Sequence, residues 1–162
     1  MTTGPMSTGR ALLLPDTAAT EALGRALAAA RPARGRLLLE GELGAGKSTL
    51  ARALLRALGV RGSIRSPTYT LVERYPLADG GEAAHLDLYR LGDAAELDFL
   101  GLDELEQAAS LWLVEWPCRG GERLPAADLR LQLAMLPEGR EARLEALSPA
   151  GAGWIAGLQR PG

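Results

Sequence analysis

Apolar runs and helical periodicity alternate in the first third of the chain. Two short leucine-rich runs predict strands, and the second, RLLLE, is apolar along nearly its whole length, as expected for a central parallel strand buried on both faces. Alanine and leucine at helical spacing predict a helix after each strand. The expected elements are a strand at 11–14, a helix from an N-cap at Asp16 or Thr17 to about Arg31, a strand at 36–40 and a helix at 49–58.

In the rest of the chain, alternating apolar and polar residues separated by turn residues predict two antiparallel hairpins. The first hairpin turns at 79–81 and the second at 137–140, where glycine permits a tight reversal. The last dozen residues carry no readable pattern. The expected elements are strands at 68–75 and 84–89, one or two short amphipathic helices within 93–106, a strand at 111–114 that ends in Glu115, and strands at 129–136 and 142–148.

This order of elements predicts an α/β protein. Strand, loop and helix follow one another early in the chain, and hairpins come later, so we expect a three-layer sandwich like that of P-loop NTPases, with antiparallel hairpins in a mixed central sheet. The chain has 162 residues, of which 47% are hydrophobic and 23% charged, and this suits one domain over 1–162. Residues 1–10 are expected to be flexible.

The segment between the strand at 36–40 and the helix at 49–58 reads GELGAGKS, which matches the Walker A pattern in its required context. The glycines let backbone N–H groups converge on phosphate oxygens, and the helix N-terminus adds partial positive charge. Lys47 is the only lysine among 18 basic residues, and the Ser48 hydroxyl can ligate Mg²⁺. The motif predicts ATP and Mg²⁺ as cofactors. The expected nucleotide-binding residues here are Gly41, Glu42, Leu43, Gly44, Ala45, Gly46, Lys47, Ser48 and Thr49.

Three further residues are candidates for catalysis at a nucleotide site. Glu115 closes an apolar strand, where an acidic residue of a P-loop protein holds the metal or its waters. Asp87 alternates with leucines and would serve the metal's outer shell or orient the attacking water. Thr68 follows the predicted P-loop helix, where sensors of γ-phosphate sit. For both carboxylates the alternative is a solvent-facing strand residue, and His85 is taken as an ordinary hairpin side chain.

Composition and short motifs exclude several classes of protein. The formal net charge is −2 and there is no arginine-rich run, so we expect neither DNA binding nor direct grip on RNA. A lone Cys118 and the lack of any long apolar segment favour a cytoplasmic protein without membrane attachment. The chain contains no asparagine, so the N-K-x-D motif that reads guanine in GTPases is absent.

Five strings in order resemble the bacterial TsaE family, also called YjeE: GELGAGKST at 41–49, SPTYTLVERY at 66–75, HLDLYRL at 85–91, ELDFLGLDEL at 96–105 and LVEWP at 113–117. The resemblance spans about Leu14 to Arg143. It implies a small ATPase, slow when isolated, that is needed to make threonylcarbamoyladenosine at position 37 of tRNA (t6A37). It also implies TsaB and TsaD as partners, whose complex the ATPase binds and resets, with tRNA contacted only indirectly.

The same resemblance implies roles for particular residues. Lys47 binds phosphate, Ser48 and Glu115 hold Mg²⁺, and Asp87 is an essential acidic residue. Thr68 lies in the loop facing the γ-phosphate, Trp116 adjoins the nucleotide, and Arg140 is similar to a position lining the nucleotide pocket. The chain departs from the family at Glu42, where aspartate is common, and at Ser48, where threonine is common; the second change keeps the hydroxyl.

Two other functions remain compatible with the sequence. One is a nucleotide-gated binding module that works through ATP occupancy and hydrolyses it incidentally. The other is a small-molecule P-loop kinase, although such enzymes need an arginine-bearing lid and an acceptor pocket, for which this chain has limited room.

Overall fold

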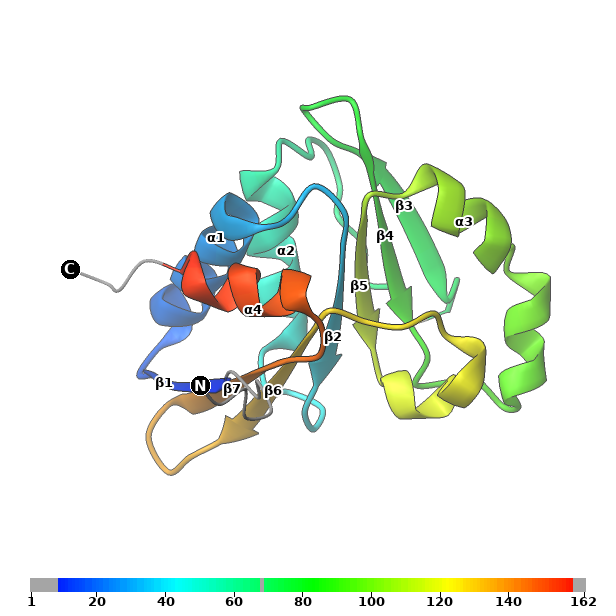
Figure 1. The fold of residues 1–162 in the computed structure, drawn as a ribbon. Helices are drawn as coiled ribbons and strands as arrows, with labels where there is room; N and C mark the ends of the chain where they lie inside the picture. Colours follow the sequence, from blue (N-terminus) through cyan, green and yellow to red (C-terminus); the bar gives the residue numbers. More distant parts are fainter. Residues whose placement is uncertain (1–8, 68, 159–162) are drawn as a thin grey trace, which may run out of the picture.

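Seven strands form one mixed sheet in the computed structural model, which describes residues 9–67 and 69–158 (Figure 1). Their order is β1-β7-β6-β2-β5-β4-β3. β2 runs parallel to β5 and β6, and β4 runs parallel to β5, whereas the other neighbours are antiparallel. The strands are β1 (Gly9–Leu14), β2 (Gly35–Glu40), β3 (Val72–Pro76), β4 (Glu82–Asp87), β5 (Leu111–Glu115), β6 (Leu129–Met135) and β7 (Arg140–Ala146).

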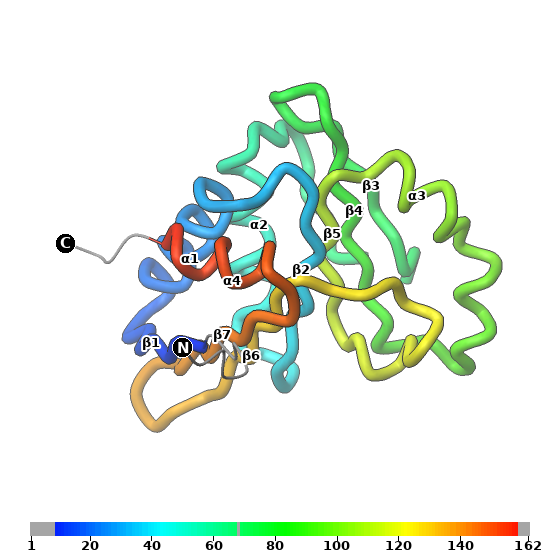
Figure 2. Tube along the Cα trace, in the orientation of Figure 1, coloured from blue at the N-terminus to red at the C-terminus, as the bar shows by residue number. Residues whose placement is uncertain are grey.

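Helices cover both faces of the sheet, each over its own apolar core. Leucines of α1 and α2, with Trp154 and Ile155 of α4, pack on one face, and Leu97 and Leu105 pack with Trp112 on the other. Figure 2 shows α4, in red, beside α1, in blue, although they come from opposite ends of the chain. The helices are α1 (Thr17–Ala30), α2 (Lys47–Ala57), α3 (Leu102–Ala108) and α4 (Pro149–Ala156), with 3₁₀ turns η1 (Ala94–Phe99), η2 (Pro117–Arg119) and η3 (Gly121–Arg123).

The predicted mixed α/β sheet, its three layers and both hairpins are confirmed, and the exceptions are local. β3 begins at Val72, not at residue 68, because Leu71 has a φ of +68°, a left-handed conformation that ends strand geometry. β4 ends at Asp87, before the predicted end at residue 89, and a turn follows at 89–90. Gly9 and Arg10 belong to β1 instead of the expected flexible segment, whose residues 1–8 lie outside the described range.

The helix α4 was not predicted, although the sequence carried a signal for its start. Ser148 caps the helix by accepting a hydrogen bond from the Gly151 backbone N–H at 3.1 Å, and Pro149 follows at the first helical position. A serine before a proline is a common way to begin a helix. Two glycines inside the segment, Gly151 and Gly153, hide the helix because glycine lowers helix propensity.

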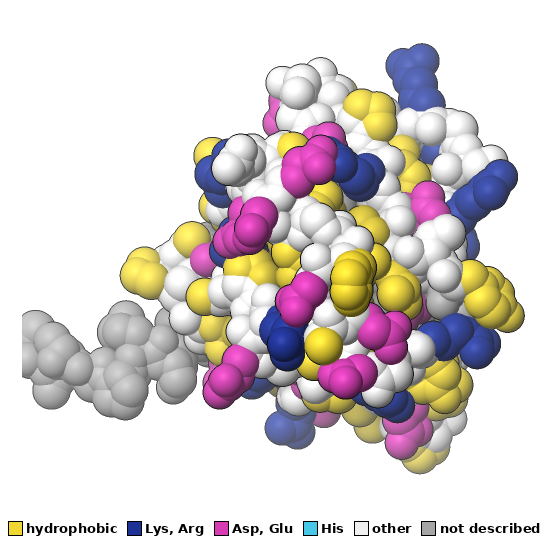
Figure 3. All heavy atoms as spheres, turned by 90° about the vertical axis from the view of Figure 1, so that its right-hand side faces the viewer, with side chains coloured by type: hydrophobic (Ala, Val, Ile, Leu, Met, Phe, Trp, Pro, Cys, Tyr) yellow, Lys and Arg dark blue, Asp and Glu magenta, His cyan; other side chains and the backbone are white. Residues whose placement is uncertain are grey.

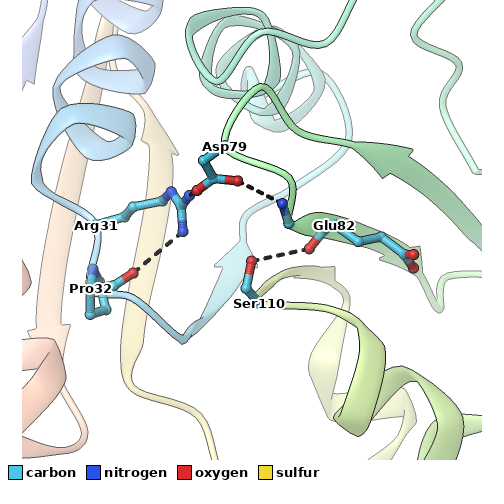
Figure 4. Close-up of polar contacts among 6 residues, drawn as sticks. Arg31, Pro32, Asp79, Glu82 and Ser110 are labelled. Atoms are coloured by element: carbon cyan, nitrogen blue, oxygen red, sulfur yellow. Dashed lines mark hydrogen bonds and ion pairs between the residues drawn. The ribbon is translucent and has the colours of Figure 1, made fainter.

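Polar contacts close the edge of the sheet at which the parallel strands begin (Figure 4). Arg31, after α1, bonds to Asp79 in the β3–β4 turn, and the Ser110 hydroxyl donates to the carbonyl oxygen of Glu82 at 3.4 Å. These contacts hold the starts of β4 and β5 in place. The carboxyl ends of the parallel strands lie at the opposite edge of the sheet. Within residues 9–67 and 69–158, no helix has the length and apolar character that crossing a membrane requires.

Candidate nucleotide site

The site lies where the parallel strands end. β2, β5 and β4 run in the same direction, and the register pairs Leu39 with Glu115 and Glu115 with Asp87 near their carboxyl ends. The loop 41–46 connects β2 to α2 at this edge (Figure 1). Ligands of open α/β sheets bind outside the carboxyl ends of the strands. The fold therefore brings the glycine-rich loop and both predicted carboxylates to the edge where such sheets bind ligands.

The backbone of the loop 41–46 follows a path that requires glycine. Gly41 has a φ of +150°, and a Cβ there would lie 2.6 Å from the carbonyl oxygen of Leu133 on β6. Gly46, the residue before α2, has a φ of +107°. L-residues with side chains rarely adopt these angles. The turn presents the first residues of α2, with their partial positive charge, to the pocket described below.

Lys47 is the first residue of α2 and is only 5% exposed. Its Nζ donates to the carbonyl oxygens of Gly41 and of Glu42, the latter at 3.1 Å. Burial lowers the pKa of Lys47, and the nearby Glu115 and Asp87 carboxylates oppose that shift. The one lysine of the chain is therefore held inside the site, close to both acidic side chains.

Asp87 and Glu115 are buried, which excludes the alternative that they face solvent on the strand surface. Asp87 Oδ1 accepts a hydrogen bond from the Tyr89 backbone N–H at 3.0 Å. Burial raises the pKa of Asp87, and the hydrogen bond from Tyr89 opposes this effect. Leu86 and Leu88 lie in the core on the opposite side of the strand, as their alternation with Asp87 predicted.

His85 lies on β4 of the β3–β4 hairpin, as expected, and it is also buried. Its Nε2 lies 2.6 Å from Oε2 of Glu115. The signal that could have found it is the strand period, because residues 85 and 87 point to the same face.

A pocket of about 260 Å³ collects most of the predicted residues. Ser66, which sequence reasoning did not assign, also lines it, and its position in the SPTYTLVERY string was the available signal. Gly41, Glu42, Ala45 and Arg140 do not line it. Thr68 lies outside the described residues and stays a prediction. The lining residues are Leu43, Gly44, Gly46, Lys47, Ser48, Thr49, Ser66, Asp87, Glu115 and Trp116.

Trp116 follows β5 in a left-handed conformation, with a φ of +56°. Its ring contacts that of Tyr89, with 4.9 Å between centroids, and Lys47 Nζ lies 4.8 Å from its centroid. A bulky residue with positive φ is costly and tends to mark functional sites. The conformation of Trp116 and its contact with Tyr89 therefore support a functional role for this side chain in the pocket.

Arg140 acts on the loop from outside the pocket. Its Nε donates to the Ala45 carbonyl oxygen and its Nη2 to that of Gly44, both at 3.2 Å. The resemblance had suggested a residue lining the nucleotide pocket; the contacts show a residue that supports the loop.

The donor set suits a phosphate ester with Mg²⁺ better than a metal held by protein alone. Among residues 9–67 and 69–158, no group of three or more histidine, cysteine, aspartate or glutamate residues could hold a metal ion. The Ser48 hydroxyl and the Glu115 carboxylate, the two predicted metal ligands, both line the pocket with Gly44 and Gly46 of the loop. Mg²⁺ is commonly bound through one or two protein oxygens, substrate phosphates and waters, so the residues present fit it.

The chain is thus an α/β protein in which a Walker A sequence joins the central parallel strand β2 to α2, with two buried carboxylates lining the same pocket. The profile of the family described as "Threonylcarbamoyl adenosine biosynthesis protein TsaE" matches residues 14–143. The chain belongs to the TsaE family, which is involved in the biosynthesis of threonylcarbamoyladenosine in tRNA.

Individual relatives agree with the family match. The chain is similar to the TsaE proteins of Haemophilus influenzae, 42% identical over 70% of this chain and 71% of that protein, and of Streptomyces coelicolor, 43% identical over 68% and 76%. Its fold is similar to the crystal structure of Bacillus subtilis YdiB, with a TM-score of 0.79 and 27% identity over 96% of this chain and 97% of that one.

Proposed function

We propose that this protein is a Mg²⁺-dependent P-loop ATPase that supports formation of t6A37 by binding a TsaB–TsaD complex and resetting it through ATP binding and hydrolysis. The observation that carries the proposal is the convergence of Lys47, Ser48, Asp87 and Glu115 on one pocket beside the loop 41–46. Membership of the TsaE family supports the role in tRNA modification, for which the cytoplasm is the expected site.

Each described residue has a distinct part in this mechanism. The N–H groups of the loop and of the first turn of α2 bind phosphate oxygens, and the Lys47 ammonium group offsets their charge. Ser48 and Glu115 would hold Mg²⁺, which when bound neutralises charge that develops on the β- and γ-phosphates. Asp87 lines the same pocket and orients the attacking water, while Trp116 adjoins the nucleotide.

Charge distribution supports an indirect relation to tRNA. The net charge of the chain is −2, and acidic and basic side chains are interspersed over the face that carries α3 (Figure 3). Proteins that hold nucleic acid by themselves carry a basic patch or stripe. Contact with tRNA therefore falls to TsaB and TsaD in this proposal.

Substitution of Lys47 tests the proposal directly. Lys47→Ala removes the ammonium group that faces phosphate, so ATP hydrolysis in the presence of TsaB, TsaD and Mg²⁺ should fall by about a hundredfold or more. The measurement is release of inorganic phosphate from labelled ATP, and Arg143→Ala, a change at an exposed side chain on β7, is the matched control.

Unchanged hydrolysis in the Lys47→Ala protein would contradict the proposal. Label recovered on a metabolite in place of inorganic phosphate would indicate a kinase. Repeated rounds of t6A formation with a non-hydrolysable ATP analogue would favour a nucleotide-gated binding module.

A further inference from the structure

His85 and Glu115 form a buried pair at the rear of the site. His85 is 2% exposed and Glu115 is 3% exposed, and Nε2 of the histidine lies 2.6 Å from Oε2 of the glutamate. They come from the adjacent parallel strands β4 and β5, two residues before Asp87 on one and at the last position on the other. The contact joins two segments that are 30 residues apart in the sequence.

Burial of the His85 ring costs free energy, and the contact with Glu115 is the hydrogen bond that offsets this cost. Its other ring nitrogen, Nδ1, is buried and has no hydrogen-bond partner among the described residues. A buried polar atom without a partner is unfavourable, and an apolar side chain of similar size would avoid it. The hydrogen bond to Glu115 is therefore what distinguishes histidine from leucine here.

His85 does not line the pocket, whereas Glu115 does. The contact of the histidine with the Glu115 carboxylate therefore links it to a side chain that does line the pocket. A carboxylate that holds a cation is ionised and only accepts hydrogen bonds, so in that state Nε2 donates to Oε2. This bond engages Oε2 and leaves the other oxygen, Oε1, for the pocket.

We infer that His85 is a positioning residue that holds Oε2 of Glu115 and so fixes the carboxylate as a ligand for nucleotide-bound Mg²⁺. The inference rests on the proposed function, because it assigns Glu115 to the metal. Partners that hydrogen-bond to a ligating carboxylate orient it and reduce the freedom it loses on binding the metal. Mn²⁺ serves as a spectroscopic substitute for Mg²⁺ in the test.

Two amide substitutions separate the hydrogen bond from the polarity of the side chain. In His85→Gln the amide nitrogen is as many bonds from Cα as Nε2, whereas in His85→Asn it is one bond closer and falls short of Glu115. His85→Leu removes the donor altogether. Affinity for Mn²⁺ is measured on the full chain with saturating ADP by the electron paramagnetic resonance of free Mn²⁺. ADP binding in EDTA and urea unfolding are measured on the same proteins.

The expected result is that His85→Asn and His85→Leu weaken Mn²⁺ binding by about 10- to 100-fold, whereas His85→Gln stays within about threefold of the wild type. ADP affinity in EDTA should remain unchanged in all three, because Glu115 does not then bind a metal. If His85→Leu does not fold, the glutamine and asparagine variants decide the matter.

Two outcomes overturn the inference alone: Mn²⁺ affinity in His85→Asn close to that of the wild type, or an equal loss in His85→Gln and His85→Asn. Wild-type protein that binds no ADP, with or without Mn²⁺, overturns the proposed function and the inference with it.

Discussion

At the scale of single residues, the site combines burial with charge. Asp87 is 7% exposed, close to the Glu115 carboxylate and the Lys47 ammonium group, and burial dominates the shift of its pKa upward. A buried carboxylate is disfavoured as an anion unless neighbours compensate fully. This residue therefore reduces the stability of the folded chain at neutral pH.

Replacement of Asp87 by asparagine should stabilise the nucleotide-free protein at neutral pH. The pKa of Asp87 in the folded protein lies above the unfolded value of about 3.9. As pH falls, Asp87 therefore takes up its proton at a higher pH in the folded protein than in the unfolded chain. Stability of the wild type should thus decline as pH rises from that value through the raised folded pKa, and this part of the decline should vanish in Asp87→Asn.

Urea unfolding in EDTA across pH 4 to 8 measures the effect. The gain in unfolding free energy should be largest at the alkaline end and shrink toward about pH 4, near the unfolded pKa, below which Asp87 is protonated in both states. A gain that grew on acidification would contradict the assignment of burial as the main cause.

At the scale of elements, the phosphate-binding loop depends on a strand remote in sequence. Arg140, the first residue of β7, donates to the carbonyl oxygens of Gly44 and Ala45 across 95 or more residues. In a trans peptide the N–H points away from the carbonyl, so holding Ala45 O on the outside turns the Gly46 N–H to the other side. Gly46 lines the pocket, and the β6–β7 hairpin is therefore part of the loop's support.

Arg140→Ala should weaken nucleotide binding by about tenfold, because two charge-assisted hydrogen bonds that order the loop are lost. Binding is measured by calorimetry with ADP and Mg²⁺. Arg143→Ala, on the same strand with a side chain 68% exposed, should bind as the wild type does. Equal affinity in both variants would show that the loop keeps its shape without Arg140.

At the scale of the whole molecule, the C-terminal helix completes the core. Trp154 is 1% exposed, and its Nε1 donates to the Leu27 carbonyl oxygen of α1 at 2.9 Å. It packs near Gly35, where β2 begins, so it lies toward the edge of the sheet opposite the pocket. Substitutions in α4 should therefore lower the stability of the protein without changing its affinity for nucleotide.

Trp154→Ala should lower the free energy of unfolding by about 3–5 kcal/mol, the usual cost of removing a large buried aromatic side chain. Urea unfolding gives the change, with Leu147→Ala, at a residue 39% exposed, as a control that should cost far less. Nucleotide affinity under native conditions should stay near that of the wild type, and a comparable loss of affinity would contradict the separation.

Local patterns were enough to predict most elements and the loop. The apolar run at 36–40, the glycines of 41–46 and the helical spacing after them each depend on near neighbours in the chain, so hydrophobic periodicity and backbone sterics determine them. Asp87 was placed opposite its leucines for the same reason. Leu71 shows the limit, since its left-handed backbone interrupts a segment whose composition favours a strand.

The strand, loop and helix that carry Lys47 and Ser48 follow from the amino-acid sequence, because their geometry depends on residues a few positions apart. Which distant residues complete the site depends on the packing of the strands. The strand order β2-β5-β4 sets Glu115 beside Asp87 and within reach of His85, and β7 brings Arg140 to the loop. His85 and Glu115 are 30 residues apart and Arg140 and Ala45 are 95 apart, separations at which only packing of the whole sheet brings residues together.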